Sequence, residues 1–149
     1  MSFKAFNFNP AITEGIKVMG YAEPTPIQIK SIPKILGGQD VMALAQTGTG
    51  KTASFILPIL QRLMEKTDGA AVRALIIAPT RELAEQTHRV VEFLGEKTRI
   101  RGTSIYGGVS MAAQVQVLRR GVQIVSACPG RLLDHVQQGT IDLSNVEIL

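Results

Sequence analysis

Two kinds of hydrophobic pattern take turns along this chain: short apolar runs, and longer segments in which apolar residues recur every three or four positions. Short apolar runs are typical of buried strands, and the longer period is typical of helices with one buried face. The runs predict strands at residues 41–44, 74–78, 103–106, 122–127 and 146–149. Because helices are predicted between successive strands, we expect an α/β fold: a parallel sheet with helices on both faces.

The predicted helices have identifiable ends. One follows Asn9-Pro10 and stops at Gly20. The next starts at Thr25 as N-cap with Pro26 in the first helical position, restarts at Pro33 and ends at residues 37–38. The helix after residue 52 carries a proline, Pro58, which should bend it. The remaining three are expected from Leu83, Thr87, Val90, Val91 and Leu94 on one face, from Met111, Val115 and Leu118 before Gly121, and over residues 131–138 before Gly139.

Composition narrows the class of protein. A chain of 149 residues with 45% hydrophobic residues can bury the core of one globular domain. It has no apolar run near the ~20 residues of a membrane helix, and Met1-Ser2-Phe3-Lys4 lacks a signal-peptide core. The single cysteine, Cys128, excludes an internal disulfide, so we expect a cytoplasmic protein. A net charge of +4 does not by itself identify a nucleic-acid partner.

A glycine-rich loop, Ala45-Gln46-Thr47-Gly48-Thr49-Gly50-Lys51-Thr52, joins the first predicted strand to the helix behind it. Glycines let successive main-chain N–H groups turn inward, and a helix N-terminus favours negative charge. Lys51 would reach the β- and γ-phosphates of a nucleotide, and the Thr52 hydroxyl would help to hold magnesium. The loop therefore predicts a nucleotide site.

The loop has two other possible interpretations. Gly48-x-Gly50-x-x-Ala53 also fits a dinucleotide-binding turn, which requires an acidic residue about 20 positions further on to hold the ribose. The next predicted strand instead runs into Pro79-Thr80-Arg81, without an acid at its end. A plain glycine turn is the third possibility, and the Lys-Thr pair favours phosphate binding over it.

Gln28 has two possible roles. Thr25-x-x-Gln28 has the spacing of a capping box, in which the two residues cap the same helix start reciprocally. Alternatively, the amide of Gln28 could read adenine, donating to N7 and accepting from N6. The residues alone place capping ahead.

Pro79-Thr80-Arg81 opens a helix directly after a strand. Exposed N–H groups, the helix dipole and the charge of Arg81 make a phosphate site, although Thr80 could equally be an ordinary cap. His88 and His135 have no partners at ligand spacing, so we expect no metal site held by protein ligands.

Taken in order, five motifs resemble those of the DEAD-box RNA helicases over the whole chain. They are Gly20-Tyr21-x-x-Pro24-Thr25-Pro26-Ile27-Gln28, the loop at 45–52, Pro79-Thr80-Arg81-Glu82-Leu83-Ala84, Gly107-Gly108 and Pro129-Gly130-Arg131. The resemblance implies the first part of the family's N-terminal domain, a RecA-like P-loop NTPase fold, with the glutamine motif within residues 1–28. It also implies ATP or ADP with Mg²⁺ as cofactors, and RNA bound through its phosphates without regard to sequence.

The same resemblance implies roles for individual residues. Gln28 reads adenine, Phe3 stacks on the base, and Lys51 and Thr52 take part in catalysis, Thr52 through the magnesium ion. The residues expected around the nucleotide are Phe3, Tyr21, Pro26, Gln28, Gln46, Thr47, Gly48, Thr49, Gly50, Lys51, Thr52 and Ala53. Those expected to contact RNA are Pro79, Thr80, Arg81, Gly108, Pro129, Gly130 and Arg131.

The chain departs from the family pattern at two places. Cys128 stands where the family has threonine, so the hydroxyl contact to RNA is not expected. The chain stops at Leu149, where Asp-Glu-Ala-Asp would begin, and Glu147 lies too early to replace it. The sequence therefore predicts a piece of a helicase, without the later motifs and the C-terminal RecA-like domain that carries the arginine finger. Such a piece should bind adenine nucleotide without turning it over.

Overall fold

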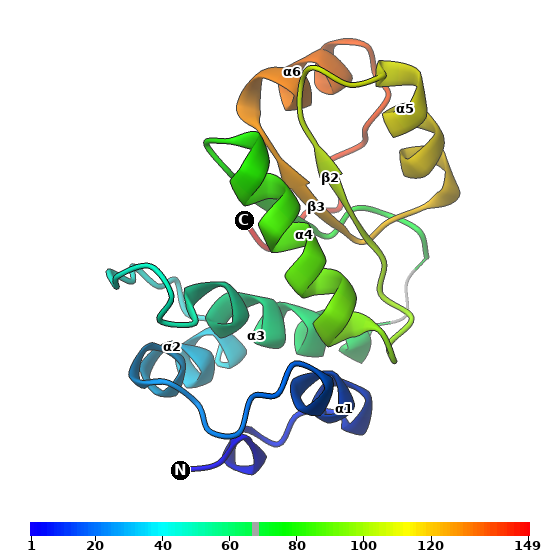
Figure 1. Cartoon of the computed structure of the whole chain (residues 1–149). Coiled ribbons are helices and arrows are strands. Elements are labelled where there is room, and N and C mark those ends of the chain that lie inside the picture. The colour runs from blue at the N-terminus through cyan, green and yellow to red at the C-terminus, as the bar shows by residue number, and fades with distance from the viewer. Residues whose placement is uncertain (67–68) are drawn as a thin grey trace. The chain divides into compact units, whose positions relative to one another are not determined.

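Residues 1–66 and 69–149 are described by the computed structural model of the chain, and they divide into two compact units (Figure 1). The first unit contains Met1–Lys66 and Phe93–Arg99, and the second contains the other described residues. Along the chain the elements are η1 (Phe3–Phe6), α1 (Pro10–Val18), α2 (Pro26–Leu36), α3 (Lys51–Glu65), β1 (Ala74–Ile77), α4 (Arg81–Gly95), β2 (Gly102–Ile105), α5 (Met111–Arg120), β3 (Ile124–Ala127) and α6 (Pro129–Gln137). None of the described helices is long and apolar enough to cross a membrane.

Local sequence signals set the helices of the first unit. Asn9 caps α1 by accepting a hydrogen bond from the main-chain nitrogen of Ala11 at 2.9 Å, with Pro10 in the first position. Thr25 and Gln28 form the capping box of α2. Gly38, which follows the end of α2, has a φ of 76°, in the left-handed region that favours glycine.

The core of the first unit is made of aliphatic side chains from its helices. Fully or almost fully buried residues are Ile12, Ile16, Ile32, Ile56, Leu57, Leu60, Leu63 and Leu94. Gly15 of α1 lies against the main chain at Leu94, where an added Cβ would stand 2.3 Å from the carbonyl oxygen. Only glycine allows this approach, so this position fixes how closely the two segments pack.

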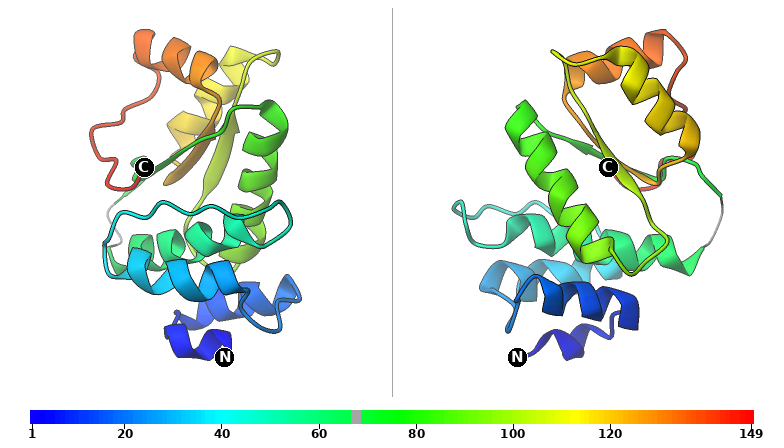
Figure 2. Two further views of the ribbon diagram at one scale, coloured as in Figure 1. Left: turned by 90° about the vertical axis from the view of Figure 1, so that its left-hand side faces the viewer. Right: turned by 45° about the vertical axis from the view of Figure 1, so that its right-hand side comes forward.

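The second unit contains a three-stranded parallel sheet in the order β1-β3-β2. Ile77, Ala127 and Ile105 are aligned in register at the carboxyl ends of the three strands. Helices α5 and α6 lie on one face of the sheet and α4 lies on the other, as Figure 2 shows in its right-hand view. The α/β class and the parallel sheet with helices on both faces are thus confirmed.

Side chains from both faces explain this arrangement. On the α5 and α6 face the buried cluster is Val72, Leu75, Ile105, Val122, Val125, Ala127 and Leu132, with Val117, Leu118, Ile141, Leu143 and Val146 packed around it. On the α4 face, Gly102 of β2 lies against Val91, whose side chain would stand 2.9 Å from a Cβ added at that glycine. Alternating strand residues therefore serve opposite helix layers.

The predicted strand at 41–44 is not formed. The segment has no regular structure, and Met42 and Leu44 are 93% and 92% exposed. A four-residue apolar run becomes a strand only when a neighbouring strand satisfies its main-chain groups and side chains cover it. The three strands of the sheet all belong to the second unit, whereas residues 41–44 belong to the first.

Three other sequence predictions need correction. Helix α2 continues through Pro33 without a restart, because one internal proline removes only one hydrogen bond of the helix. The strand expected at 146–149 is reduced to an isolated parallel bridge between Ala74 and Ile148. Leu83, expected on the buried face of α4, is 45% exposed, and Ala84 is buried in its place.

Candidate nucleotide and phosphate sites

The loop that precedes α3 has the backbone expected of a phosphate cradle. Gly48 and Gly50 have φ values of 78° and 82°, in the left-handed region where a side chain is strained. Ser54 donates the first main-chain hydrogen bond of α3, to the carbonyl oxygen of Gly50 at 3.1 Å. The N–H groups before it, those of Lys51, Thr52 and Ala53, therefore have no partner within the helix. Nothing lies within 4 Å of a Cβ added at Gly48, so the loop is open on that side.

Side chains of the loop close it on itself. The ammonium group of Lys51 donates a hydrogen bond to the carbonyl oxygen of Ala45. The hydroxyl of Thr49 donates to the carbonyl oxygen of Gln46 at 2.7 Å. Both bonds join the beginning of the loop to its end, and they place the Lys51 ammonium inside the turn, beside the N-terminus of α3.

Helix α2 holds the other side of this loop. The Thr25 hydroxyl donates to the carbonyl oxygen of Thr49 at 2.8 Å, and the Gln28 amide donates to that of Gly50 at 3.1 Å. The Gln28 oxygen accepts from the Thr25 main-chain nitrogen at 3.0 Å, and Gln28 is only 2% exposed. The capping box is therefore confirmed, and the same amide also fixes the loop. Recognition of adenine by Gln28 stays a prediction.

The aromatic residues near the N-terminus pack on one another. The Phe3 ring is 7% exposed and stacks on Tyr21, with centroids 6.4 Å apart and planes 20° from parallel. Phe6 meets Phe3 edge-on at 6.1 Å. Burial raises the pKa of the Tyr21 hydroxyl. Pro26 is exposed at the first position of α2. Stacking of Phe3 on a nucleotide base stays a prediction.

A second candidate site lies along the carboxyl edge of the sheet, in the second unit. Parallel strands place their carboxyl ends at one edge, and here those ends lead into residues 78–81, 106–109 and 128–131. Pro79, Thr80, Arg81, Gly108, Pro129 and Gly130 are all exposed. We name these three segments the phosphate edge.

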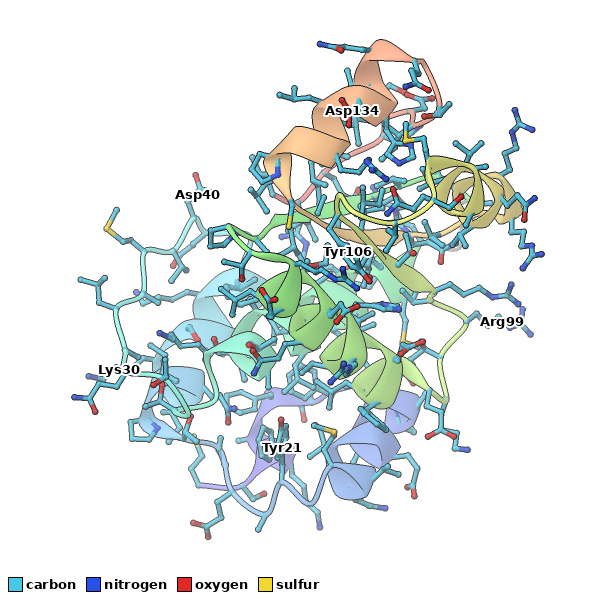
Figure 3. The ribbon with its side chains drawn as sticks, turned by 45° about the horizontal axis from the view of Figure 1, so that its top comes forward. Tyr21, Lys30, Asp40, Arg99, Tyr106 and Asp134 are labelled. Carbon is cyan, nitrogen blue, oxygen red and sulfur yellow. The ribbon has the colours of Figure 1, made fainter. Side chains whose placement is uncertain are left out.

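Arg81 and the turn after β2 meet on the phosphate edge. The Arg81 guanidinium lies over the Tyr106 ring, 4.7 Å from its centroid, and a Cβ at Gly108 would stand 3.9 Å from Arg81 Nη1. The Tyr106 hydroxyl donates a hydrogen bond to Glu85 of α4, and this bond is the main cause of a raised pKa for the tyrosine. Figure 3 labels Tyr106 beside this helix. Tyr106 therefore orients the guanidinium of Arg81, the first residue of α4.

Arg131 joins the turns after β2 and β3. Its Nη1 donates to the carbonyl oxygen of Val109 at 2.9 Å and to the Gln114 side-chain oxygen at 3.2 Å. Its Nε lies 3.5 Å from an Asp134 carboxylate oxygen, and its side chain is 15% exposed. In the described part of the chain no hydrogen bond engages Nη2, so that nitrogen remains available to an anion.

Thr80 and Cys128 stand at corresponding helix starts and behave differently. Thr80 caps α4, since its hydroxyl accepts from the main-chain nitrogen of Leu83 at 3.3 Å. Cys128 is the N-cap residue of α6, yet its thiol makes no capping hydrogen bond. Burial, and then the charge of Glu82, raise the pKa of this thiol. The Cys128 thiol therefore stays neutral and is a weak donor. The ordinary capping role of Thr80 is confirmed.

Near the C-terminus, the acidic side chain of Glu147 forms an ion pair with Arg73. Glu147 accepts from Arg73 at 2.8 Å, and the Arg73 side chain is 6% exposed. Within residues 1–66 and 69–149, no group of three or more histidine, cysteine, aspartate or glutamate side chains could hold a metal ion. Thr52 is a half-buried residue in the first turn of α3.

Sequence reasoning overlooked two residues of the phosphate edge. The sequence predicts Tyr106 only as the last residue of a strand, although an aromatic side chain directly before Gly107-Gly108 is in a position to cover an exposed strand end. Gln114 is not among the predicted site residues, although it falls on the apolar stripe of α5 with Met111 and Leu118. A polar side chain at such a position signals a buried hydrogen-bonding partner.

Comparison with known proteins places the chain in a family. The DEAD/DEAH box helicase family model matches residues 25–149. An ATP-dependent RNA helicase CshA from Limosilactobacillus reuteri is 41% identical across the whole chain, which covers 30% of that protein. The ATP-dependent rRNA helicase RRP3 of Saccharomyces cerevisiae is 46% identical over 91% of the chain and 27% of its own length. The DEAD-box ATP-dependent RNA helicase 29 of Oryza sativa is 43% identical over 91% of the chain and 16% of its length.

The chain thus spans less than a third of the length of each of these relatives. The matched region starts at the helix cap Thr25 and includes the loop at 45–52 and all three segments of the phosphate edge. Because the family model covers far more than half of its residues, the chain belongs to the DEAD/DEAH box helicase family.

Proposed function

We propose that this chain is the nucleotide-binding and RNA-binding portion of an ATP-dependent RNA helicase. The observation that carries the proposal is the loop at 45–52, whose open glycine turn is anchored on Gln28, in a chain of the DEAD/DEAH box family. The relatives are named as RNA helicases that depend on ATP, and the whole protein would couple ATP hydrolysis to local unwinding of RNA duplexes.

The loop fits a nucleotide triphosphate chain. The free N–H groups at the start of α3 and the Lys51 ammonium supply positive charge, and the open side at Gly48 leaves room for phosphate oxygens. Lys51 would exchange its bond to Ala45 for one to phosphate. The Thr52 hydroxyl would help to hold Mg²⁺, and Gln46, Thr47, Thr49 and Ala53 would line the cradle. A bound ATP would supply the phosphoryl group for hydrolysis.

Gln28 supports a preference for adenine nucleotides. Of its two amide N–H groups, one is bonded to Gly50, and its oxygen has a second lone pair. Those remaining positions match the donor and acceptor pattern that distinguishes adenine from guanine. Phe3 and Tyr21 would supply an aromatic surface for the base.

The phosphate edge supports RNA binding. Most of its residues are exposed, it carries the Arg81 cation, and its glycines at 107, 108 and 130 let main-chain N–H groups approach a sugar-phosphate chain. No base-reading side chain stands among its motifs, so binding should be independent of sequence. Cys128 would contribute packing rather than a hydroxyl contact.

We further propose that the 149-residue chain alone binds nucleotide without turnover. Hydrolysis needs an acidic group that holds magnesium and orients the attacking water. Glu147, the only acidic residue of the predicted last strand, lies too early for this role and is paired with the buried Arg73. Binding does not require that group, because Lys51 and the loop hold the phosphates.

Two titrations test the function. Lys51→Ala should abolish ADP binding measured by calorimetry, whereas the matched Lys30→Ala on the exposed surface of α2 should not change it. Arg81→Ala should weaken binding of a fluorescent single-stranded RNA, whereas Arg119→Ala, exposed in the last turn of α5, should change it little. Absence of ADP binding by the unchanged chain would refute the nucleotide site, and absence of RNA binding would refute the phosphate edge.

A further inference from the structure

We infer that Gln114 and His135 are positioning residues for the phosphate edge. They would hold Arg131 and the turn at 107–109 in the arrangement that meets RNA. This inference deepens the proposed RNA binding and rests on it for its functional part. Its structural part, the control of Arg131 by Gln114, is independent of any ligand.

Gln114 connects three segments through one side chain. Its amide nitrogen donates to the carbonyl oxygen of Tyr106 at 2.9 Å. Its amide oxygen accepts from Arg131 Nη1 at 3.2 Å and lies 2.9 Å from His135 Nε2. Gln114 belongs to α5, Tyr106 directly follows β2, and the other two belong to α6. The buried Gln114 amide, in a residue that is 9% exposed, therefore joins the turn after β2 to helix α6, which follows β3.

The hydrogen bonds determine the protonation of His135. Because the Gln114 nitrogen donates to Tyr106, the amide atom that faces His135 is the oxygen, which can only accept. His135 Nε2 must then carry the hydrogen. Its Nδ1 lies 2.7 Å from the Thr140 hydroxyl, whose one hydrogen can go to Nδ1 or to the His135 carbonyl oxygen at 3.2 Å. Because Nε2 carries the imidazole hydrogen, Nδ1 of the neutral ring is an acceptor, and the shorter contact directs the hydroxyl hydrogen to it. The imidazole is 0% exposed and is satisfied on both sides while neutral.

This chain of bonds ends at the phosphate edge. Nη1 of Arg131 uses both of its hydrogens, one on Gln114 and one on the carbonyl oxygen of Val109, next to Gly108. Without the Gln114 side chain, the Arg131 guanidinium would lose one hydrogen bond, and the Tyr106 carbonyl oxygen would lose its side-chain donor. Both changes fall on the segments proposed to contact RNA, so the buried pair sets the geometry of the exposed ones.

The chemistry of the position supports a positioning role. Gln114 lies on the apolar stripe of α5, where methionine or leucine would fill the space without a polar group to satisfy. A buried polar network of this kind specifies one arrangement only while all its members are bonded. The network includes Arg131 and the carbonyl groups of Tyr106 and Val109, on either side of Gly107-Gly108. These parts of the phosphate edge lie outside the strands.

The first experiment uses the free protein and NMR. The Nε–Hε signal of Arg131 reports the order of its guanidinium, and long-range ¹⁵N couplings report which nitrogen of His135 carries the hydrogen. We expect the Nε2–H form at neutral pH, and loss of Arg131 order in Gln114→Met but not in the matched, exposed Gln116→Met. An Nδ1–H tautomer, or an Arg131 equally ordered in Gln114→Met, overturns the inference whether or not RNA binds.

The second experiment is a double-mutant cycle on RNA affinity with Gln114→Met, Arg131→Met and both changes together. If Gln114 acts through Arg131, Gln114→Met should weaken binding of a single-stranded RNA by roughly tenfold, the effect of one lost buried hydrogen-bonding partner. The double variant should then be little weaker than Arg131→Met. ADP affinity should stay unchanged in every variant. Losses that multiply independently overturn the inference.

His135 supplies a variant for the case in which Gln114→Met does not fold. His135→Gln keeps a donor near the position of Nε2, whereas His135→Leu removes it. The inference requires that His135→Gln retain more RNA affinity and more Arg131 order than His135→Leu. Equal behaviour of the two variants, with Arg131 ordered in both, counts against it. If the unchanged chain binds no RNA, the proposed function fails, and the NMR result still decides the role of Gln114.

Discussion

The side-chain amide of Gln28 donates a hydrogen bond to the main-chain oxygen of Gly50, 3.1 Å away. The oxygen of the same amide accepts from the main-chain nitrogen of Thr25 at 3.0 Å. One side chain thus ties the start of α2 to the start of α3. It shapes the loop at 45–52 before any nucleotide is present, so its capping role and its predicted ligand role are linked.

Gln28→Ala should therefore weaken ADP binding by roughly tenfold or more, since it removes a buried hydrogen-bonding partner from the loop and from the proposed base contact. Calorimetry with ADP and GDP is the measurement, and Gln137→Ala, exposed at the end of α6, is the control. Equal affinity of the unchanged chain for the two nucleotides would rule out adenine reading. If Gln28→Ala still prefers ADP over GDP, another residue must recognise adenine.

Arg81→Ala should reduce RNA affinity about equally for unrelated single-stranded sequences, because the proposed contact of the guanidinium is with phosphates rather than bases. The logarithm of affinity should fall with the logarithm of salt at a slope on the order of −2 to −3, and the variant should reduce that slope by roughly 0.7. Fluorescence anisotropy over a range of salt concentrations measures both. Strong preference for one sequence, or affinity that salt does not change, would contradict the proposal.

Tyr106 should matter through its ring rather than its hydroxyl. The Arg81 guanidinium lies 4.7 Å from the ring centroid, a contact worth ~0.5–1 kcal/mol at an exposed site. Tyr106→Leu should therefore weaken RNA binding by roughly two- to fivefold. Tyr106→Phe, which keeps the ring and loses the bond to Glu85, should have the smaller effect. The same anisotropy assay decides, and a larger loss in Tyr106→Phe would show that the hydroxyl is the important group.

Sequence reasoning succeeded where structure depends on neighbours along the chain. The caps at Asn9 and Thr25, the turn at Gly121 and the loop at 45–52 are all set by local hydrogen bonds or by a positive φ. The sheet strands were predicted because β1, β2 and β3 combine apolar runs with helices long enough for parallel crossovers.

It failed where structure depends on contacts distant in sequence. Residues 41–44 are as apolar as a strand, but a strand also needs a partner, and that requirement cannot be read from a four-residue run. The bonds of Gln114 to Tyr106, Arg131 and His135 connect residues that are 8 to 21 positions apart. A polar residue on an apolar stripe indicates that some partner exists, and only the fold shows which one.

Phosphate release by the 149-residue chain should remain at background, with or without RNA. We propose that Lys51 and Thr52 hold a nucleotide, but catalysis requires metal and water to be held where charge develops in the transition state. An arginine finger alone contributes ~10³–10⁵ in rate in related reactions. Lys51→Ala controls for contaminating phosphatases. RNA-stimulated release that disappears in Lys51→Ala would show that another acidic residue, Glu82 or Glu147, supports turnover.

Stability should fall on the acid side of neutrality, and His135 should be a main cause. Burial, and then the positive charge of Arg131, lower the pKa of His135 in the folded chain, while Asp134 acts in the opposite direction. In the unfolded chain a histidine titrates near ~6.5. Between the folded pKa and ~6.5 the unfolded state therefore binds more protons than the folded state. The free energy of unfolding rises with pH across that window, so the stability is fully present above it and is lost as pH falls.

His88 contributes with the same sign, because burial lowers its pKa more than Glu92 and Glu85 raise it. Denaturant midpoints measured from pH 8 to pH 5 for the unchanged chain, His135→Gln and His88→Gln separate the two. We expect the midpoint of the unchanged chain to fall between pH 7 and pH 5, and that of His135→Gln to fall less. A His135→Gln curve parallel to that of the unchanged chain would mean that the buried imidazole accepts a proton without cost, donating through Nδ1 to Thr140.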